Sequence, residues 1–274
     1  MGTPSRYEME PLVQSRIVAR ALAGHPATGR YECFVVGADD PLADVARVVE
    51  REVFEASFGN DAAVMTAEYG PYEDRSLFFV VLDRRHGVPA GVVRVIEDHG
   101  VRVKTLEDAP AYLGVPISEI VAAHGLDHGL VWDYATLAVP RKYRNVEVST
   151  ILHRTFVAAG QRAGVTHSLA MMDRGSWRNI RLVGIPVRQL AGSEPFEYLG
   201  SKENRAIYIE FKEIQPAAVA QYRSLRRTGR PLVGELPGRG WRRLIARFVA
   251  TRAARRVSTG RGVDEHVHYR LQFT

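Results

Sequence analysis

Hydrophobic and polar residues follow a regular pattern from residue 31 onward. Residues 31–38, YECFVVGA, form an apolar run of strand length, and residues 41–59 repeat apolar side chains at helical spacing. Asp40 stands at the position expected for the cap of that helix. Two further apolar runs, 76–83 and 90–97, flank a short polar turn and predict a hairpin. The first half of the chain is therefore predicted as strand, helix, strand, strand.

The second half is centred on LVWDYATLAV, residues 130–139, which is apolar enough for a strand buried on both faces. The polar turn PRKYRN ends this strand, and residues 146–164 return to helical periodicity. Further strands are predicted at 165–173 and 205–211. Helices and strands that alternate in this way predict an α/β (α+β) fold with a mixed sheet.

We divide the chain into three predicted segments. Residues 1–30 form a helical or irregular N-terminal segment, and residues 31–212 form the main domain. Residues 213–274 form an arginine-rich extension with an amphipathic helix and a final strand.

Composition narrows the class of protein. The chain has 274 residues, 46% of them hydrophobic and 25% charged, as is usual for a globular protein. No apolar run approaches the roughly 20 residues that span a bilayer, and the first residues lack the apolar core of a signal peptide. Cys33 is the single cysteine, so we expect a buried structural thiol, no disulfide and a cytoplasmic location.

The net charge of +6 is concentrated in one segment. Between residues 223 and 261 twelve arginines face one acid, Glu235, which gives +11. Subtracting +11 from +6 leaves −5 for the rest of the chain. The basic character therefore belongs to the extension, and nucleic acid is an unlikely partner of the main domain.

Two segments resemble motifs of known enzymes. Residues 91–95, GVVRV, are similar to the G-x-x-R-L strand of acyl-homoserine-lactone synthases, and residues 131–139, VWDYATLAV, to their V-W-E-L-S-R-F-A-V. Residues 31–212 thus resemble the GCN5-related N-acetyltransferase (GNAT) superfamily, nearest to these synthases and to long-chain N-acyl amino acid synthases. The resemblance implies a GNAT-like mixed, mostly antiparallel central sheet flanked by helices, and N-acyltransferase activity.

The chain also departs from these families. Thr136 stands where the synthases carry an arginine, which argues against a homoserine-lactone product. Both glycines of the superfamily's Q/R-x-x-G-x-G/A turn are replaced in RKYRNV, residues 141–146. The region of the catalytic tyrosine, residues 174–186, holds Trp177 and Asn179 instead, which we interpret as packing and capping residues.

Attack of an amine on a thioester requires a group that accepts the amine proton. We predict Asp133 and Arg94 as catalytic residues, with Asp133 as the general base, directly or through water. Strand alternation would place Asp133 and Leu137 on one face and Thr136 on the other. An ion pair of Asp133 with Arg94 is an alternative structural role, and the two roles are compatible.

The donor is predicted to bind where the central strand runs into the polar turn. A helix N-terminus favours phosphate, and basic side chains add to the attraction. The resemblance implies that the donor pairs alongside the end of the strand. The predicted donor-binding residues are Leu137, Ala138, Val139, Arg141, Lys142, Arg144 and Asn145, and the co-substrate is acyl-CoA or an acyl-acyl carrier protein. The alternative is that the three basic residues are simply solvated.

Two histidine pairs could suggest a metal, but neither has a third ligand arranged near it. His124 and His128 are four residues apart, and His266 and His268 alternate along a predicted strand. We therefore predict no metal site.

The extension carries a basic amphipathic helix at residues 238–257. Its apolar stripe comprises Trp241, Leu244, Ile245, Phe248 and Val249. Such a helix can lie on an anionic membrane, dock an acyl carrier protein, or pack its stripe on its own domain. These three alternatives stay open at this point.

Together these patterns predict an N-acyltransferase that moves an acyl group from acyl-CoA or acyl carrier protein to a small amine acceptor. The alternative is a non-catalytic module of the same fold, which binds an acyl thioester or uses its basic extension to bind a protein or membrane partner.

Overall fold

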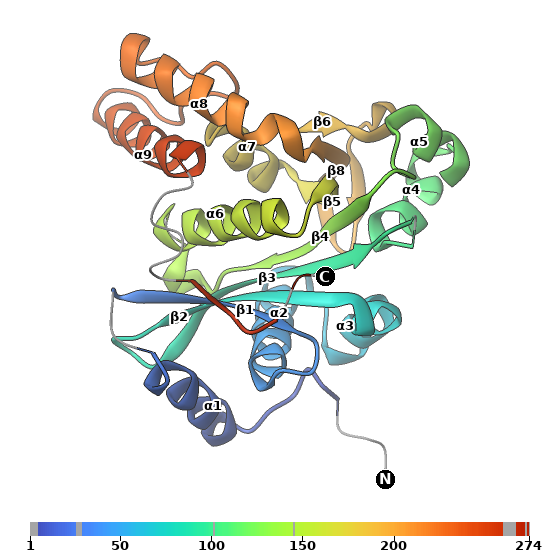
Figure 1. The fold of residues 1–274 in the computed structure, drawn as a ribbon, viewed down its shortest axis with the longest axis vertical. Coiled ribbons are helices and arrows are strands. Elements are labelled where there is room, and N and C mark those ends of the chain that lie inside the picture. The colour runs from blue at the N-terminus through green and yellow to red at the C-terminus, as the bar shows by residue number, and fades with distance from the viewer. Residues whose placement is uncertain are drawn as a thin grey trace. The chain divides into compact units, whose positions relative to one another are not determined.

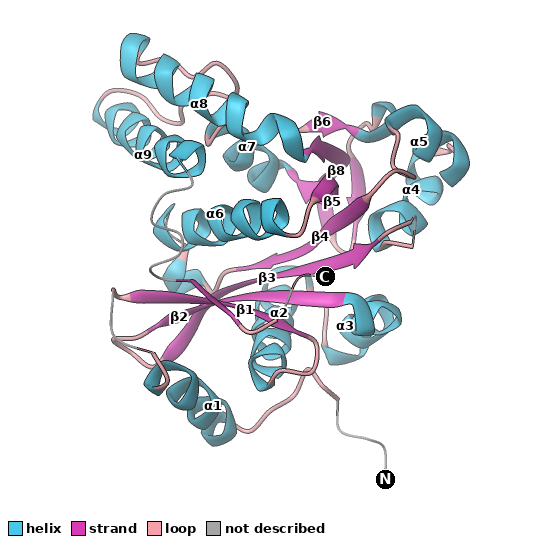
Figure 2. Cartoon of the chain, in the orientation of Figure 1, coloured by secondary structure: helices cyan, strands magenta, loops and turns pink. Residues whose placement is uncertain are grey.

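A computed structural model describes residues 5–25, 29–100, 102–144, 146–259, 267–271 and 273 (Figures 1 and 2). The chain forms two compact units, the first from residues 1–98, 133–156 and 262–274, the second from residues 99–132 and 157–261. The boundaries fall inside strand β4 (Leu130–Ala138) and helix α6 (Val146–Arg162). Our predicted boundaries at residues 30 and 212 stay a prediction.

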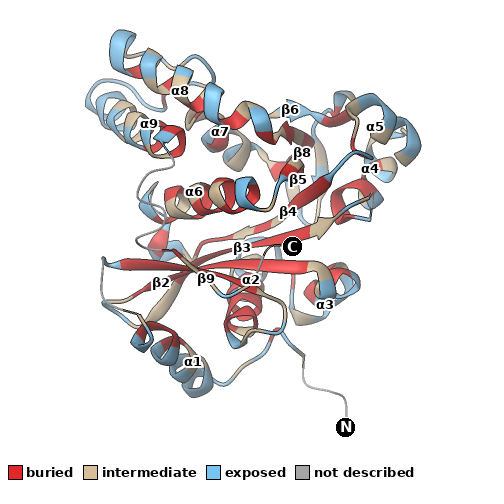
Figure 3. Cartoon of the chain, viewed as in Figure 1, coloured by how far each residue is buried: buried red, intermediate tan, exposed pale blue. Residues whose placement is uncertain are grey.

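The first unit contains a sheet in the order β9, β1, β2, β3, β4. Its other strands are β1 (Tyr31–Gly37), β2 (Ser76–Asp83), β3 (Val88–Asp98) and β9 (Val267–Tyr269). β1 pairs antiparallel with β2, and β2 with β3, whereas β9 runs parallel to β1. Strand β2 is buried along its whole length (Figure 3). The predicted hairpin and the mixed, mostly antiparallel character of the sheet are confirmed.

Helices of the first unit are α1 (Pro11–Ala23), α2 (Pro41–Phe58) and α3 (Ala62–Tyr69), with 3-10 turns η1 (Gly70–Arg75) and η2 (Arg141–Tyr143). The predicted cap of α2 is confirmed, because the Asp40 side chain accepts a hydrogen bond from the Leu42 amide at 2.8 Å. Apolar side chains of α1 and α2 pack against β1, β2 and β3 to form the core of this unit.

Gly91, the first residue of the G-x-x-R motif, permits close approach of α6 to β3. A Cβ atom at this position would lie 2.8 Å from Cγ1 of Val148 and 3.3 Å from Cδ1 of Leu152. Any larger side chain would therefore have to push α6 away from the strand. The glycine of the motif thus has a packing role in this chain.

The second unit contains β5 (Val165–Asp173), β6 (Arg188–Gln189), β7 (Phe196–Tyr198) and β8 (Ser201–Glu210). β8 pairs antiparallel with each of the other three. The helices are α4 (Lys104–Leu113), α5 (Ile117–His124), α7 (Arg174–Leu182), α8 (Phe211–Thr228) and α9 (Trp241–Thr259), with a 3-10 turn η3 (Leu190–Gly192). Within the part of the chain that the structure describes, no helix is long and apolar enough to cross a bilayer.

Candidate active site

A buried ionic cluster lies between α2, η1 and β3 of the first unit. Arg94 is fully buried, and its Nε and Nη2 donate to the carboxylate of Glu50, with Nη2 to Oε2 at 2.7 Å. Its Nη1 donates to Glu73 at 2.9 Å, and Nη2 also donates to the Tyr7 hydroxyl at 2.7 Å. All three guanidinium nitrogens of Arg94 are thus bound within the protein. Through these hydrogen bonds Arg94, one of the two predicted catalytic residues, can hold its neighbours in place.

Further side chains complete the cluster. Arg47 of α2 is also fully buried and binds Glu73 at 2.5 Å, so that two arginines share this carboxylate. Although burial alone raises the pKa of Glu73, Arg94 and Arg47 outweigh it and hold this pKa below its usual value. Thr136 of β4 donates a short hydrogen bond to Glu50. The cluster is therefore compensated in charge and linked to the central strand.

The two faces of the first unit's sheet can be assigned from β2. Phe78 lies under the guanidinium of Arg47 in α2, 4.9 Å from ring centroid to Cζ. Its neighbour Phe79 contacts Phe156 in α6, with ring centroids 6.2 Å apart. Because successive strand residues point to opposite faces, α2 and α6 cover opposite faces of the sheet.

Strand β4 does not keep this alternation. Tyr134 packs on α6, 5.0 Å from the ring of Phe156, whereas Thr136 contacts Glu50 in α2. Two residues of a regular strand separated by one other would share a face, so the alternation of β4 is interrupted between Tyr134 and Thr136. Asp133, the neighbour of Tyr134, then lies on the α2 face with Thr136. Our expectation that these two side chains point to opposite faces is wrong for that reason.

Asp133 is fully buried on the face that carries the Arg94 cluster. It also contributes to the electrostatics of Tyr69 in α3, whose pKa is raised well above the usual value first by burial, then by Glu50 and, to a smaller extent, by Asp133. The ring of Tyr69 in turn lies 5.0 Å from the guanidinium of Arg94. The predicted base and the predicted arginine therefore belong to one buried environment.

The predicted donor-binding residues occupy the end of β4 and the turn after it. Leu137 is half-buried, Ala138 and Val139 are buried, and Arg141 and Lys142 are exposed. Arg144 is exposed but engaged, because it donates to the Val139 carbonyl at 3.1 Å and to the Ser57 hydroxyl at 3.1 Å. Asn145 lies outside the described residues. Among the described residues of the turn, Arg141 and Lys142 of η2 are the exposed basic groups that form no side-chain hydrogen bond or ion pair, and the Lys142 ammonium lies 5.4 Å from the ring centroid of Tyr143.

Tyr143 anchors this turn to the sheet. Its hydroxyl donates to the buried carboxylate of Asp83 at 3.1 Å, and Asp83 also binds Arg30 at 2.9 Å and His86 at 2.8 Å. Burial raises the pKa of Asp83, but these three hydrogen bonds outweigh it and hold the pKa well below its usual value. Burial and the bond to Asp83 raise the pKa of Tyr143 to about 12.

We expect Asp83→Asn to destabilise the fold by about 2–3 kcal/mol at pH 7, because the variant loses charge-assisted hydrogen bonds. A carboxylate with a lowered pKa stabilises the folded state above its unfolded pKa of about 3.9, and this contribution is lost as the pH falls. The difference between the two proteins should therefore shrink below pH 4. Urea unfolding over a pH series measures it.

The control is Asp74→Asn, since the Asp74 side chain is 80% exposed and its nearest cation, Arg75, is 3.7 Å away. This variant should unfold within about 0.5 kcal/mol of the original protein at every pH. A constant difference for Asp83→Asn from pH 7 to pH 3 would contradict the assigned role.

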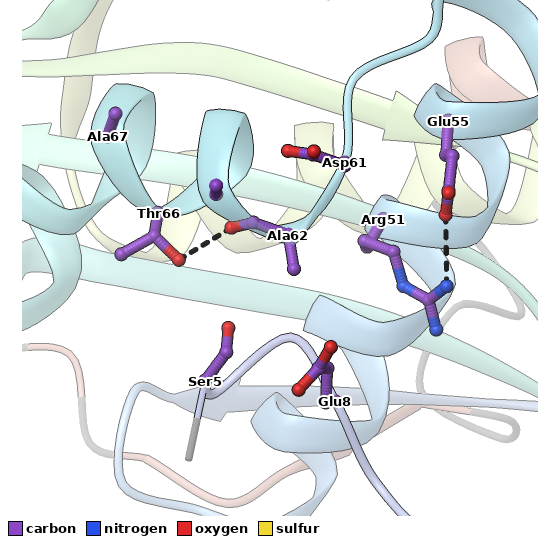
Figure 4. Close-up of a pocket in the computed structure, with 9 residues that line it drawn as sticks. Ser5, Glu8, Arg51, Glu55, Asp61, Ala62, Thr66 and Ala67 are labelled. Carbon is purple, nitrogen blue, oxygen red and sulfur yellow. Dashed lines mark hydrogen bonds and ion pairs between the residues drawn. The ribbon is translucent and has the colours of Figure 1, made fainter. Parts of the chain in front are cut away.

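A pocket of about 680 Å³, with several charged side chains in its lining, lies between the N-terminal segment, α2 and α3 (Figure 4). Glu8, Arg51, Glu55 and Asp61 supply its charges. Arg51 binds Glu55 at 3.0 Å. Three acids against one arginine leave the pocket with a negative balance, which favours a cationic ligand such as a protonated amine.

Other side chains named from the sequence have packing or capping contacts, or are buried. The Cys33 thiol is buried, and burial raises its pKa to about 12, as expected for a structural thiol. Trp177 packs against the guanidinium groups of Arg181 and Arg205 at 4.4 and 5.4 Å. The cap of α7 is Asp173.

The histidines bind protein groups. His124 accepts a hydrogen bond from the Ala191 amide at 3.0 Å, and His268 lies 3.0 Å from the Glu32 carboxylate. His266 lies outside the described residues. Within the described ranges, no three residues of the His, Cys, Asp and Glu types gather in a way that could hold a metal ion.

Comparison with known proteins identifies the fold. No protein-family model matches the chain, and no curated protein matches its sequence. Among solved structures, the chain is similar to FeeM, an N-acyl amino acid synthase from uncultured soil microbes, with a TM-score of 0.51 and 15% identity over 69% of this chain and 96% of that one. The chain has a GNAT-like fold. The predicted fold class is thus confirmed.

Two more solved structures resemble this GNAT-like chain. A putative N-acetyltransferase from Lactobacillus plantarum gives a TM-score of 0.46 and 14% identity over 67% of this chain and 99% of its own. BjaI, a CoA-dependent acyl-homoserine lactone synthase solved with SAM and isopentyl-CoA, gives a TM-score of 0.44 and 14% identity over 80% of this chain and 99% of its own. At 15% identity the likeness to FeeM shows the fold alone, and the chemistry must be argued from the site.

Sequence reasoning missed most of the buried cluster. Glu50 and Arg47 lie on α2 among residues that resemble a solvated helix face, and Tyr7 lies in a segment without periodicity. The one signal in the sequence was the spacing of these two residues. Arg47 and Glu50 are three residues apart and therefore lie on the same helix face, and the apolar residues Val49 and Val53 are close by. That signal does not reveal their partners, which come from β3 and η1.

Proposed function

We propose that this protein is an N-acyltransferase that transfers an acyl group from a thioester donor to a small amine. The observation that carries the proposal is the GNAT-like fold shared with an N-acyl amino acid synthase over 96% of the synthase chain. The interrupted alternation of β4 between Tyr134 and Thr136 adds support, because a bulge in a strand leaves a backbone amide that can face a thioester carbonyl.

In the proposed reaction, the amine nitrogen attacks the thioester carbonyl carbon. A C–N bond forms, and negative charge develops on the carbonyl oxygen, where a backbone amide of β4 can stabilise it. Asp133 takes the amine proton, directly or through water. The C–S bond then breaks, and the thiolate leaves, since its low pKa makes an acid unnecessary. Arg94 acts as a positioning residue, because it holds Glu50, which in turn binds Thr136 of the reacting strand β4.

For the donor, we propose acyl-CoA or an acyl carrier protein that lies alongside Leu137 to Val139. Arg141 and Lys142 are exposed and can bind its phosphates. Arg144 ties the turn to the end of β4 through the Val139 carbonyl. We also propose a carrier protein as an alternative donor, a membrane as a partner, and a cytoplasmic location.

For the acceptor, we propose that the pocket between α2 and α3 receives the amine. Small amines are protonated near pH 7, and the excess of carboxylates in the pocket attracts such cations. Glu8 is the carboxylate most available to a ligand, because Glu55 binds Arg51 and Asp61 caps α3 through the Val64 amide at 2.9 Å.

A thiol-release assay tests this function. The protein is incubated with acyl-CoA donors of increasing chain length and a panel of amines and amino acids, and free thiol is measured against reactions without amine. Amine-dependent release with at least one pair is the expected result. Tight binding of one donor without turnover of any pair would instead identify a non-catalytic module, and absence of both would refute the thioester site.

A further inference from the structure

Helix α9 exposes a row of large apolar side chains. Trp241, Leu244, Ile245 and Phe248 are 67%, 65%, 52% and 68% exposed. Their spacing of three, four and seven residues places them on one face of the helix. Four large exposed apolar residues in one row are unusual for a surface helix and mark an interaction surface.

The opposite face of α9 holds the helix on its own unit. Ala250, Ala253, Ala254 and Val257 are buried, and Ala250 and Ala254 pack with Leu225 of α8. α9 therefore docks through small residues and directs its large apolar residues away from α8. The alternative in which the apolar stripe packs on the domain does not describe this helix.

Arginines surround the exposed row. Arg239, Arg242 and Arg243 are exposed beside it, and Arg252 and Arg255 are exposed further along the helix. The segment from residue 223 to 261 has a single acid, Glu235, so most of these twelve arginines have no carboxylate in the segment to pair with. The surface thus combines protruding apolar groups with an excess of positive charge.

We propose that α9 docks the protein on an anionic lipid bilayer. The helix lies in the plane of the interface, Trp241, Leu244 and Phe248 enter the boundary of the acyl chains, and the arginines bind lipid phosphates. An acidic carrier protein would satisfy the arginines but would leave the row of aromatic and aliphatic side chains in water. The bilayer accepts both, which favours it as the partner. The proposal does not depend on the acyltransferase reaction.

Vesicle sedimentation of the full chain, without donor or amine, tests the proposal. We expect strong binding to equal parts of phosphatidylcholine and phosphatidylglycerol, weak binding to phosphatidylcholine alone, and a blue shift of Trp241 fluorescence. Arg239→Gln with Arg242→Gln and Arg243→Gln should weaken binding on the order of a hundredfold. Trp241→Ser with Phe248→Ser should weaken it by about tenfold or more.

A matched control lies on α1, where Leu12 is 73% exposed and Arg16 and Arg20 are exposed. Leu12→Ser with Arg16→Gln and Arg20→Gln should leave vesicle binding unchanged. Equal loss in the control, equal binding to neutral and anionic vesicles, or no vesicle binding at all would overturn the proposal. So would capture of a purified acidic carrier protein that requires the α9 arginines while vesicles do not bind.

Discussion

Replacing Glu50 by alanine should destabilise the protein by about 3–5 kcal/mol, because it leaves Arg94 buried without its main partner. Nε and Nη2 of Arg94 would both lose a carboxylate, and Thr136 would lose its acceptor. Glu73 would remain on Nη1 but is shared with Arg47. Urea unfolding at pH 7 measures the loss as a shift of the midpoint at unchanged slope.

The control for this prediction lies two residues further along the same helix. Glu52 is 57% exposed and lies 3.8 Å from Arg51, so Glu52→Ala should cost less than about 1 kcal/mol. Glu50→Leu combined with Arg94→Leu removes both charges and should restore much of the stability, since a buried pair is often replaceable by apolar side chains. A double variant less stable than Glu50→Ala alone would show that the cluster contributes more than charge compensation.

Much of the fold could be predicted because apolar periodicity reflects burial. Strand β2 spans residues 76–83, where the apolar run was, and α2 begins after Asp40 as its cap predicts. These features depend on residues close together in the chain. The G-x-x-R motif likewise placed Gly91 and Arg94 on one strand, although the packing reason for the glycine became visible only against α6.

The site was predicted less well, because its geometry depends on contacts that are distant in the chain. A count of alternate residues placed Asp133 opposite Thr136, and the interruption of β4 between Tyr134 and Thr136 reverses that assignment. Nothing in VWDYATLAV marks this interruption. Tyr7 reaches Arg94 across 87 positions of sequence, from a segment that shows no pattern of its own. Charge compensation in the folded state determines such partners, and hydrophobic periodicity carries no information about it.

Asp133→Asn should lower kcat by about 10²- to 10⁴-fold if the thiol-release assay finds an active donor and amine pair, since the amide keeps the shape of the carboxylate but does not accept the amine proton. Donor affinity should change little, because the donor is proposed to bind through the end of β4 and η2. The measurement is single-turnover thiol release at saturating donor, together with donor affinity from equilibrium binding.

Stability separates catalysis from a purely structural role of Asp133. Because the side chain is fully buried and acts electrostatically on Tyr69, some loss of stability is expected in Asp133→Asn as well. Thr136→Val perturbs the same cluster through Glu50 without touching the proposed base, and so serves as the matched variant. If both variants lose stability alike and only Asp133→Asn loses turnover, the carboxylate acts in proton transfer. If turnover falls in proportion to stability in both variants, Asp133 has a structural role only. One of the carboxylates of the acceptor pocket is then the candidate for the base.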